Sequence, residues 1–158
     1  MEKLNLPEYA FRTKKEEGKP FIFDVIRKKF VVLTPEEWVR QNFIWYLKTD
    51  KKYPESLMTV EKQIMVNNNP RRFDLLIYTR NGQPHLIAEF KAPNIQITQE
   101  TFNQVVRYNM ALRVERVVVS NGLQHFACEI DYVKNSYSYL PEIPEFCERC
   151  RNEGVGFS

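Results

Sequence analysis

An Asn-Gly pair near the middle of the chain constrains the fold more than any other part of the sequence. Asn81-Gly82 separates two apolar stretches, residues 72–79 and 85–91. Asn-Gly between apolar runs is the strongest short-range signal of a β-hairpin. Two antiparallel strands joined at this turn are therefore predicted.

Two helices are predicted around this hairpin. Thr34 suits an N-cap and Pro35 the first helical position, so the first helix is expected to run to about Lys48. The second is expected over residues 98–112, with Thr98 as its N-cap. Apolar residues at helical spacing define the expected buried faces. They are Val39, Phe43, Tyr46 and Leu47 in the first helix, and Val105, Tyr108 and Leu112 in the second.

Further strands complete the predicted order. Residues 59–66 precede the hairpin, and residues 116–120 form an almost wholly apolar run, which is typical of a strand buried on both faces. Residues 124–130 are the last predicted strand. Apolar runs at residues 21–23 and 30–33 are expected to pair as a separate hairpin. This order of elements predicts an α/β sandwich with a mixed sheet.

Length and composition fit one domain. Its expected parts are a peripheral segment over residues 1–20, a core over 21–133 and a tail over 134–158. No apolar run approaches the ~18 residues of a membrane span, and the N-terminus lacks the apolar core of a signal peptide. We therefore expect a cytoplasmic protein with no membrane partner. The net charge of +3 permits nucleic-acid binding without demanding it.

Three cysteines do not indicate a disulfide framework. Cys147 and Cys150 form a C-x-x-C pair, which is at most half of a zinc site. His125 and Cys128 would have to complete it, but residues three apart in a strand point to opposite faces. We expect no structural zinc.

Two tryptophans, Trp38 and Trp45, lie seven residues apart on the side of the first helix opposite its apolar face. Exposed paired aromatics could stack on bases or form a partner surface. We favour packing under another element, such as the N-terminal hairpin.

Three charged residues interrupt the apolar strands of the central hairpin. Asp74 lies in its first strand, and Glu89 and Lys91 lie in its second. Glu89 and Lys91 are two residues apart and share a sheet face. Antiparallel pairing can bring Asp74 alongside Glu89. Because a charge in a mostly buried strand is costly unless it is paired or binds metal, the alternatives are a metal site and a surface salt-bridge cluster.

A metal site of this kind would suit phosphodiester hydrolysis. Two converging carboxylates provide the hard oxygen ligands that Mg²⁺ prefers. A neighbouring lysine can orient or help to deprotonate a water molecule, while the metal stabilises charge on a scissile phosphate. Arginines neutralise phosphate charge, and Arg71, Arg72 and Arg107 are the expected DNA contacts.

These residues also carry a family resemblance. Asp74 followed by Glu89-Phe90-Lys91 resembles the D…(D/E)-x-K signature of PD-(D/E)xK nucleases, and residues 104–108 resemble the Q-x-x-x-Y motif of the RecB-like branch. Three longer stretches resemble the N-terminal nuclease domain of type I restriction enzyme R subunits. They are residues 33–41, 88–93 and 120–125, and the resemblance covers about residues 21–132.

The resemblance implies a restriction-endonuclease-like, three-layer α/β/α core with a central mixed sheet, and a metal-dependent endodeoxyribonuclease. Asp74 and Glu89 would bind Mg²⁺, for which Mn²⁺ could substitute, with the Phe90 carbonyl as a further ligand. Lys91 would position or activate the attacking water. Gln104 and Tyr108 would support the site or contact the DNA backbone.

The family also places an acid on the first helix, for which Glu36 and Glu37 are available. Glu36 is three residues before Val39 and is expected on the buried face. Glu37 is better explained by capping Thr34. We therefore prefer Glu36.

One departure from the resemblance concerns the motor region of R subunits. The sequence has no G-x-x-x-x-G-K-[ST] phosphate-binding loop. We therefore expect a protein that acts alone or with separate motor or specificity subunits of a restriction system. The alternative is a non-catalytic DNA- or partner-binding module on the same fold.

Overall fold

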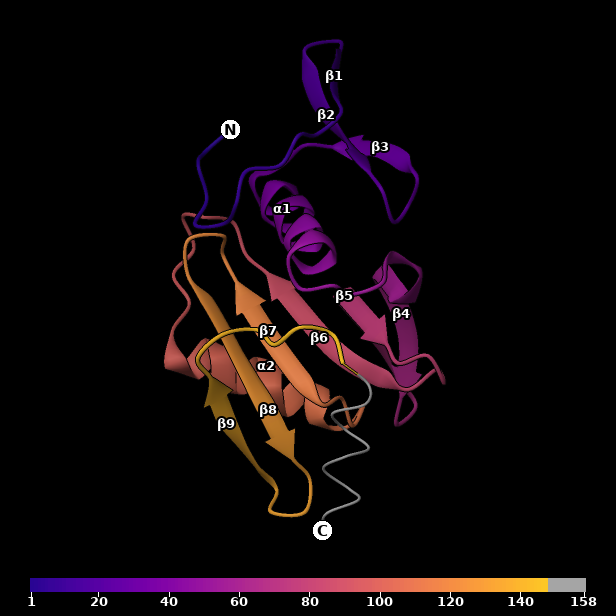
Figure 1. Cartoon of the computed structure of the whole chain (residues 1–158), viewed down its shortest axis with the longest axis vertical. Coiled ribbons are helices and arrows are strands. Elements are labelled where there is room, and N and C mark those ends of the chain that lie inside the picture. The colour runs from indigo at the N-terminus through magenta and orange to yellow at the C-terminus, as the bar shows by residue number, and fades with distance from the viewer. Residues whose placement is uncertain (148–158) are drawn as a thin grey trace.

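A six-stranded sheet forms the centre of the molecule in the computed structural model, which describes residues 1–147 (Figure 1). Its strands are adjacent in sequence order, and every pair is antiparallel except the parallel pair β6–β7. They are β4 (Met58–Val66), β5 (Asn69–Tyr78), β6 (Pro84–Phe90), β7 (Arg116–Ser120), β8 (His125–Asp131) and β9 (Ser136–Leu140). A short 3-10 helix, η1 (Glu55–Leu57), precedes β4.

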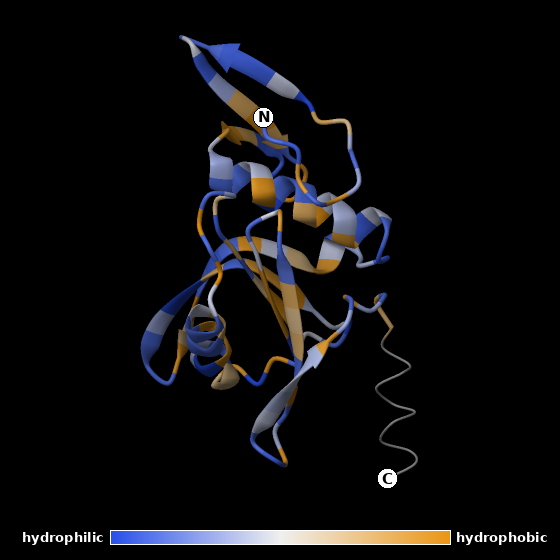
Figure 2. Cartoon of the chain, turned by 90° about the vertical axis from the view of Figure 1, so that its left-hand side faces the viewer, coloured by the Kyte–Doolittle hydropathy of each residue, from blue (hydrophilic) through white to orange (hydrophobic). Residues whose placement is uncertain are grey.

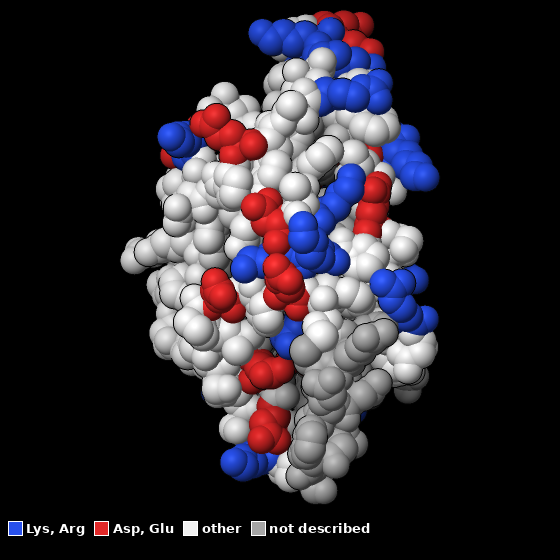
Figure 3. All heavy atoms as spheres, viewed as in Figure 1, with Lys and Arg blue, Asp and Glu red and all other residues white. Residues whose placement is uncertain are grey.

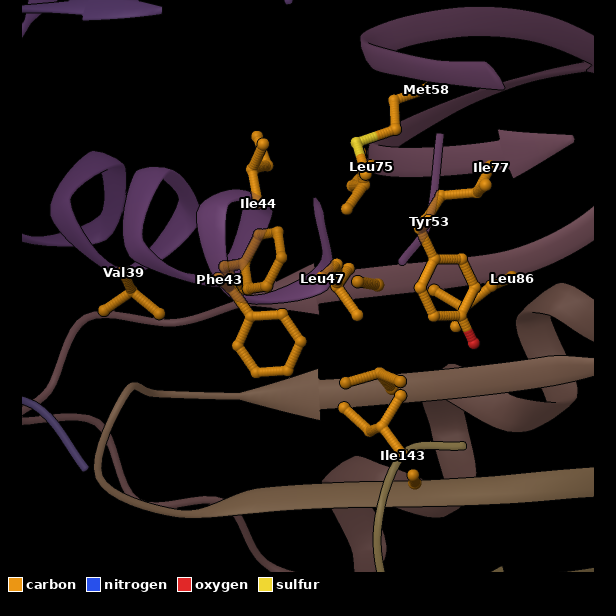
Figure 4. Close-up of a cluster of buried hydrophobic side chains, with 14 of the residues drawn as sticks. Val39, Phe43, Ile44, Leu47, Tyr53, Met58, Leu75, Ile77, Leu86 and Ile143 are labelled. Atoms are coloured by element: carbon orange, nitrogen blue, oxygen red, sulfur yellow. The ribbon is translucent and has the colours of Figure 1, made fainter. Parts of the chain in front are cut away.

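Two helices, α1 (Pro35–Thr49) and α2 (Gln99–Met110), lie on opposite sides of this sheet (Figure 2). Each helix closes its own apolar core. The α1-side core includes Phe43, Leu47 and Leu75 (Figure 4), and the α2-side core includes Phe102 and Val106. The predicted three-layer α/β/α architecture with a mixed sheet is therefore confirmed.

The start and the buried face of α1 follow the prediction. The Thr34 hydroxyl accepts a hydrogen bond of 3.0 Å from the Glu37 amide, which is the expected N-cap contact. Val39, Phe43 and Leu47 are fully buried, and Tyr46 is half-buried.

The predicted face of α2 is correct only in part, because Val105 and Leu112 pack against the α2-side core but Tyr108 does not. Thr98 caps the helix through a 3.1 Å bond from the Thr101 amide. The buried positions are Phe102, Val106 and Asn109, whereas Tyr108 is 42% exposed. An asparagine can occupy the buried face because its side-chain amide donates to the Val105 carbonyl one turn earlier.

A separate three-stranded antiparallel sheet precedes α1. It comprises β1 (Thr13–Glu16), β2 (Lys19–Asp24) and β3 (Lys29–Val32), with β2 in the middle. The predicted pairing of residues 21–23 with 30–33 is confirmed, because Phe21 opposes Val32 and Phe23 opposes Phe30. Strand β1 was not predicted, since its four residues are all exposed and lack apolar alternation.

The two tryptophans pack against the N-terminal segment. The ring centroid of Phe11 lies 5.3 Å from that of Trp38 and 6.0 Å from that of Trp45, and Tyr9 also contacts Trp45. The Trp38 indole donates to the Glu2 carbonyl. Packing under another element is therefore confirmed, but the covering element is the segment before β1 and not the hairpin.

The last strand of the sheet was also missed. Strand β9 follows β8 and pairs with it, so residues 124–130 do not contain the final strand. Edge strands such as β9 bury few residues, and only Tyr137 and Leu140 of this one are partly buried. Within residues 1–147, neither helix combines the length and the apolar character that a membrane crossing requires.

The two faces of β8 agree with the argument against zinc. His125 contacts the Phe43 ring on the α1 side, whereas Cys128 is buried in the α2-side core. Cys128 is a buried free thiol. Cys150 lies outside the described residues.

Gly122→Ala is expected to destabilise the fold more than Gly82→Ala. Both glycines have positive φ angles, +86° and +83°, so alanine costs about 1–2 kcal/mol at either position. A methyl group at Gly122 would also lie 2.7 Å from Leu4 Cδ2 and 3.1 Å from Val39 Cγ2, whereas Gly82 faces open space. We expect about 1 kcal/mol of further loss at Gly122 in urea denaturation. Equal losses in both variants would contradict this packing.

Candidate active site

Asp74 lies where strand β5 departs from regular geometry. In a regular strand, residues two apart face the same side of the sheet. Here Phe73 packs in the α2-side core, whereas Leu75 packs in the α1-side core. Regular pairing of β5 with β6 starts at Leu75, which opposes Ala88. Beyond that point the Asp74 side chain joins the strands, because its Oδ2 accepts a hydrogen bond of 2.8 Å from the Phe90 amide. This bond fixes the carboxylate against β6.

Glu89 directly precedes Phe90 on β6, so it lies next to the amide that holds the Asp74 carboxylate. Burial, followed by the nearby charge of Asp74, raises the pKa of Glu89 to about 9. At neutral pH the carboxyl of Glu89 therefore keeps its proton in the folded protein. A proton held between two acids occupies a place where a divalent cation can bind instead.

The charges of Lys91 and Glu36 act on the same pair of acids. Lys91 opposes the rise in the pKa of Glu89, and Glu36 adds to it. The pKa of Glu36 is itself raised, first by burial and then by Asp74. The Lys91 amide donates to the Ser120 carbonyl at 2.9 Å, which extends the parallel β6–β7 pairing. The structure thus brings Glu36, Asp74, Glu89 and Lys91 together.

The predicted burial of Glu36 is wrong. The side chain of Glu36 is 49% exposed, whereas Glu37 is 8% exposed. Glu37 can be buried because its Oε1 accepts a 2.6 Å hydrogen bond from Arg27 Nη2, and its Oε2 accepts one from Gln41. The charge of Asp74 acts on exposed Glu36. The expectation that the Glu37 side chain caps Thr34 is wrong, because its carboxylate binds Arg27 and Gln41 while the Thr34 amide donates to the Val32 carbonyl.

Arg40 is a member of the site that the sequence analysis missed. It is 3% exposed, and its Nη2 lies 3.7 Å from Asp74 Oδ1. Its Nη1 lies 3.2 Å from Glu61 Oε1 and 3.6 Å from Glu37 Oε1. A basic residue directly after Val39 on the buried face of α1 was the available signal, because a buried arginine requires acidic partners.

Gln104 and Tyr108 line a hollow beside Glu89. The hollow has a volume of about 310 Å³, and its other lining residues are Arg72, Val105 and Asn109. The guanidinium carbon of Arg71 lies 3.8 Å from the centroid of the Tyr108 ring. Two of the predicted DNA contacts, Arg71 and Arg72, therefore stand at this hollow or next to it.

The third predicted DNA contact is placed differently. Arg107 is exposed on α2 but does not line the hollow. Its charge acts on Tyr137 of β9. The structure therefore does not bring Arg107 together with Asp74 and Glu89.

The donor set suits a hard divalent cation with several water ligands. Across residues 1–147, no three His, Cys, Asp or Glu side chains form a ready-made metal-binding group. Asp74 and Glu89 provide two carboxylates, and the backbone of β6 offers carbonyl oxygens next to them. Mg²⁺ is usually held by one or two carboxylates and keeps several waters, so these residues fit it. They do not fit zinc, which requires four ligands in a structural site.

Comparison with known proteins adds a family to this geometry. Residues 35–144 match the family described as "Type I restriction enzyme R protein N terminus (HSDR_N)". Among solved structures, a fragment assigned as an HsdR subunit of a type I restriction enzyme from Vibrio vulnificus is similar, with 21% identity and a TM-score of 0.51. The similarity covers 77% of this chain and 26% of that one, so this chain spans only part of that relative. No curated protein matches.

Glu89→Gln is expected to stabilise the metal-free protein at about pH 8 and to lose this advantage towards pH 5. Glu89 ionises near 4.5 in the unfolded chain but only near 9 in the folded state. Wild-type stability should therefore fall as pH rises through that interval, by at most about 1.4 kcal/mol per pH unit. Glutamine has no proton to lose. Urea denaturation in EDTA measures the difference.

Glu100→Gln, in the exposed first turn of α2, is the matched control for this measurement. It should follow the wild-type pH dependence. If the free energies of unfolding of Glu89→Gln and wild type differ by the same amount at pH 5 and pH 8, the pKa of Glu89 is not raised in the folded protein.

Proposed function

Because the chain belongs to the HSDR_N family, the N terminus of the type I restriction enzyme R protein, we propose that it is a Mg²⁺-dependent DNA nuclease of the PD-(D/E)xK type. The observation that carries this proposal is the hydrogen bond that holds the Asp74 carboxylate on the Phe90 amide, between Glu89 and Lys91. Their arrangement provides an oxygen-rich cation site and an ammonium group at one point.

Asp74 and Glu89 would hold the cation, together with the Phe90 carbonyl. Bound Mg²⁺, which Mn²⁺ could replace, would supply positive charge next to the scissile phosphate. The Phe90 amide keeps the Asp74 carboxylate in place before the cation arrives. Arg40, 3.7 Å from Asp74 on the α1 side, limits the repulsion among the acids.

The remaining roles fall to side chains around the two acids. Lys91 would orient the attacking water and assist its deprotonation. Glu36, which is exposed and lies near Asp74, would contact the solvent side of the same cation site. Gln104 and Tyr108 would contact the DNA next to the cleaved bond, since both line the hollow at Glu89.

The proposed substrate is duplex DNA, with phosphate contacts at Arg71 and Arg72. Arg72 is exposed but forms an ion pair of 3.1 Å with Glu61, which it would have to share with a phosphate. We propose that separate motor or specificity subunits of a restriction system supply translocation and target choice. A nuclease of this kind acts in the cytoplasm.

The second candidate is a binding module without catalysis. It is favoured by the ion pairs of Arg40 with Asp74 and of Arg72 with Glu61, which already compensate acids at the site without a cation. Such a module would hold DNA or a partner subunit on the same fold.

Asp74→Asn and Lys91→Met are each expected to reduce plasmid nicking in Mg²⁺ or Mn²⁺ by about 100-fold or more, since both remove a group that acts at the reacting phosphate. Lys134→Met is the matched control, because Lys134 is exposed in the turn between β8 and β9. Agarose-gel assays of supercoiled DNA give the rates. Equal nicking by wild type and both site variants would end the catalytic assignment.

Calorimetric titration separates the two candidates. The nuclease should bind Mg²⁺ or Mn²⁺ with a saturable heat, and Asp74→Asn should weaken this binding about tenfold or more because it removes one of two carboxylates. A binding module would take up DNA equally well in EDTA and in Mg²⁺, and would show no metal heat that depends on Asp74.

A further inference from the structure

We infer that the small sheet before α1 is a second DNA-binding surface, which holds the phosphate backbone of duplex DNA next to the candidate active site. We call residues 12–32, which contain β1, β2 and β3, the basic arm. This inference rests on the proposed function, because it identifies where the substrate of that site is held.

The basic arm concentrates the positive charge of the protein. Between Arg12 and Lys29 the chain has seven Lys or Arg against three Asp or Glu, which gives +4. Since the whole chain carries +3, the rest of the protein has a net charge of −1. Figure 3 shows Lys and Arg gathered at the end of the molecule where β1 and β2 lie in Figure 1, with an acidic tip.

The lysines of the arm are available to a ligand. Five are exposed, and they are Lys14, Lys15, Lys19, Lys28 and Lys29. Lys14 shares its charge with exposed Glu16 at 2.7 Å. Asp24 does not neutralise any of the exposed lysines, because it is fully buried and forms an ion pair of 2.5 Å with Arg27.

One face of the arm combines cations with aromatic rings. Arg12 lies over the Phe23 ring at 4.5 Å, and Lys14 lies over the Phe30 ring at 4.5 Å. Each ring restrains a long basic side chain, which reduces the conformational entropy lost on binding. Because the cations cover these rings, the face offers positive charge and not free stacking surfaces. It therefore suits phosphates better than bases.

Ion pairs connect the arm to the candidate active site. Arg27, in the turn between β2 and β3, contacts Glu37 at 2.6 Å and Glu61 at 3.5 Å. Arg40 contacts the same two acids and also Asp74. The turn that carries Lys28 is thus held over β4, the strand next to the one that carries Asp74. A backbone bound along this turn would continue towards the acids.

The test is duplex binding by a variant with Lys14→Gln, Lys28→Gln and Lys29→Gln. Fluorescence anisotropy with a labelled 30-base-pair duplex in EDTA measures affinity without cleavage. We expect the variant to bind about tenfold more weakly than wild type near 0.1 M salt. The slope of log affinity against log salt concentration should also become shallower by about two to three, because each phosphate contact contributes about 0.9 to that slope. Thermal unfolding at the wild-type temperature would show that the variant folds.

The matched control is Lys3→Gln, Lys52→Gln and Lys134→Gln, which removes the same charge from exposed positions outside the arm. It should keep at least half of the wild-type affinity. Equal affinity and salt dependence in the arm variant and wild type would overturn the inference. An equal loss of affinity in the control variant, or no duplex binding by wild type, would also overturn it. Wild-type binding that depends on the arm, without nicking in Mg²⁺, would instead overturn the nuclease and leave the arm intact.

Discussion

The hydrogen bond from the Phe90 amide to the Asp74 carboxylate is the contact on which the rest of the candidate site depends. Strand β5 changes which core it faces at Asp74, so the strands lose their regular pairing there. The side chain replaces the missing main-chain bond and thereby satisfies a buried amide. The same bond holds the Asp74 carboxylate next to Glu89, which directly precedes Phe90.

Charge compensation around these acids extends well beyond them. Burial, followed by the charge of neighbouring Asp74, raises the pKa of Glu89. Arg40 of α1 compensates the negative charge of Asp74 and also pairs with Glu37. Arg27, in the turn between β2 and β3, pairs with the same Glu37. Removing one member of such a buried group leaves another charge unpaired, which is costly. The first helix, the small sheet and the central hairpin are therefore energetically linked.

Sequence reasoning succeeded where structure is determined locally. The Asn81-Gly82 turn, the Thr34 and Thr98 caps and the apolar run at residues 116–120 all depend on neighbours a few positions away. It failed where a residue distant in the sequence determines burial or strand pairing. The burial of Glu37 requires Arg27, and the buried face of α2 includes Asn109. Strand β9 is stabilised by pairing with β8, which its own short sequence does not reveal.

The packing of the two tryptophans has a spectroscopic consequence. Trp38 and Trp45 are the only tryptophans in the chain, and both belong to one aromatic group with Tyr9 and Phe11. Intrinsic fluorescence of this protein is therefore a reporter of a single location, the seam between the N-terminal segment and α1. An emission shift would record that seam opening, and it would be silent about the acids of the central hairpin unless the two regions separate together.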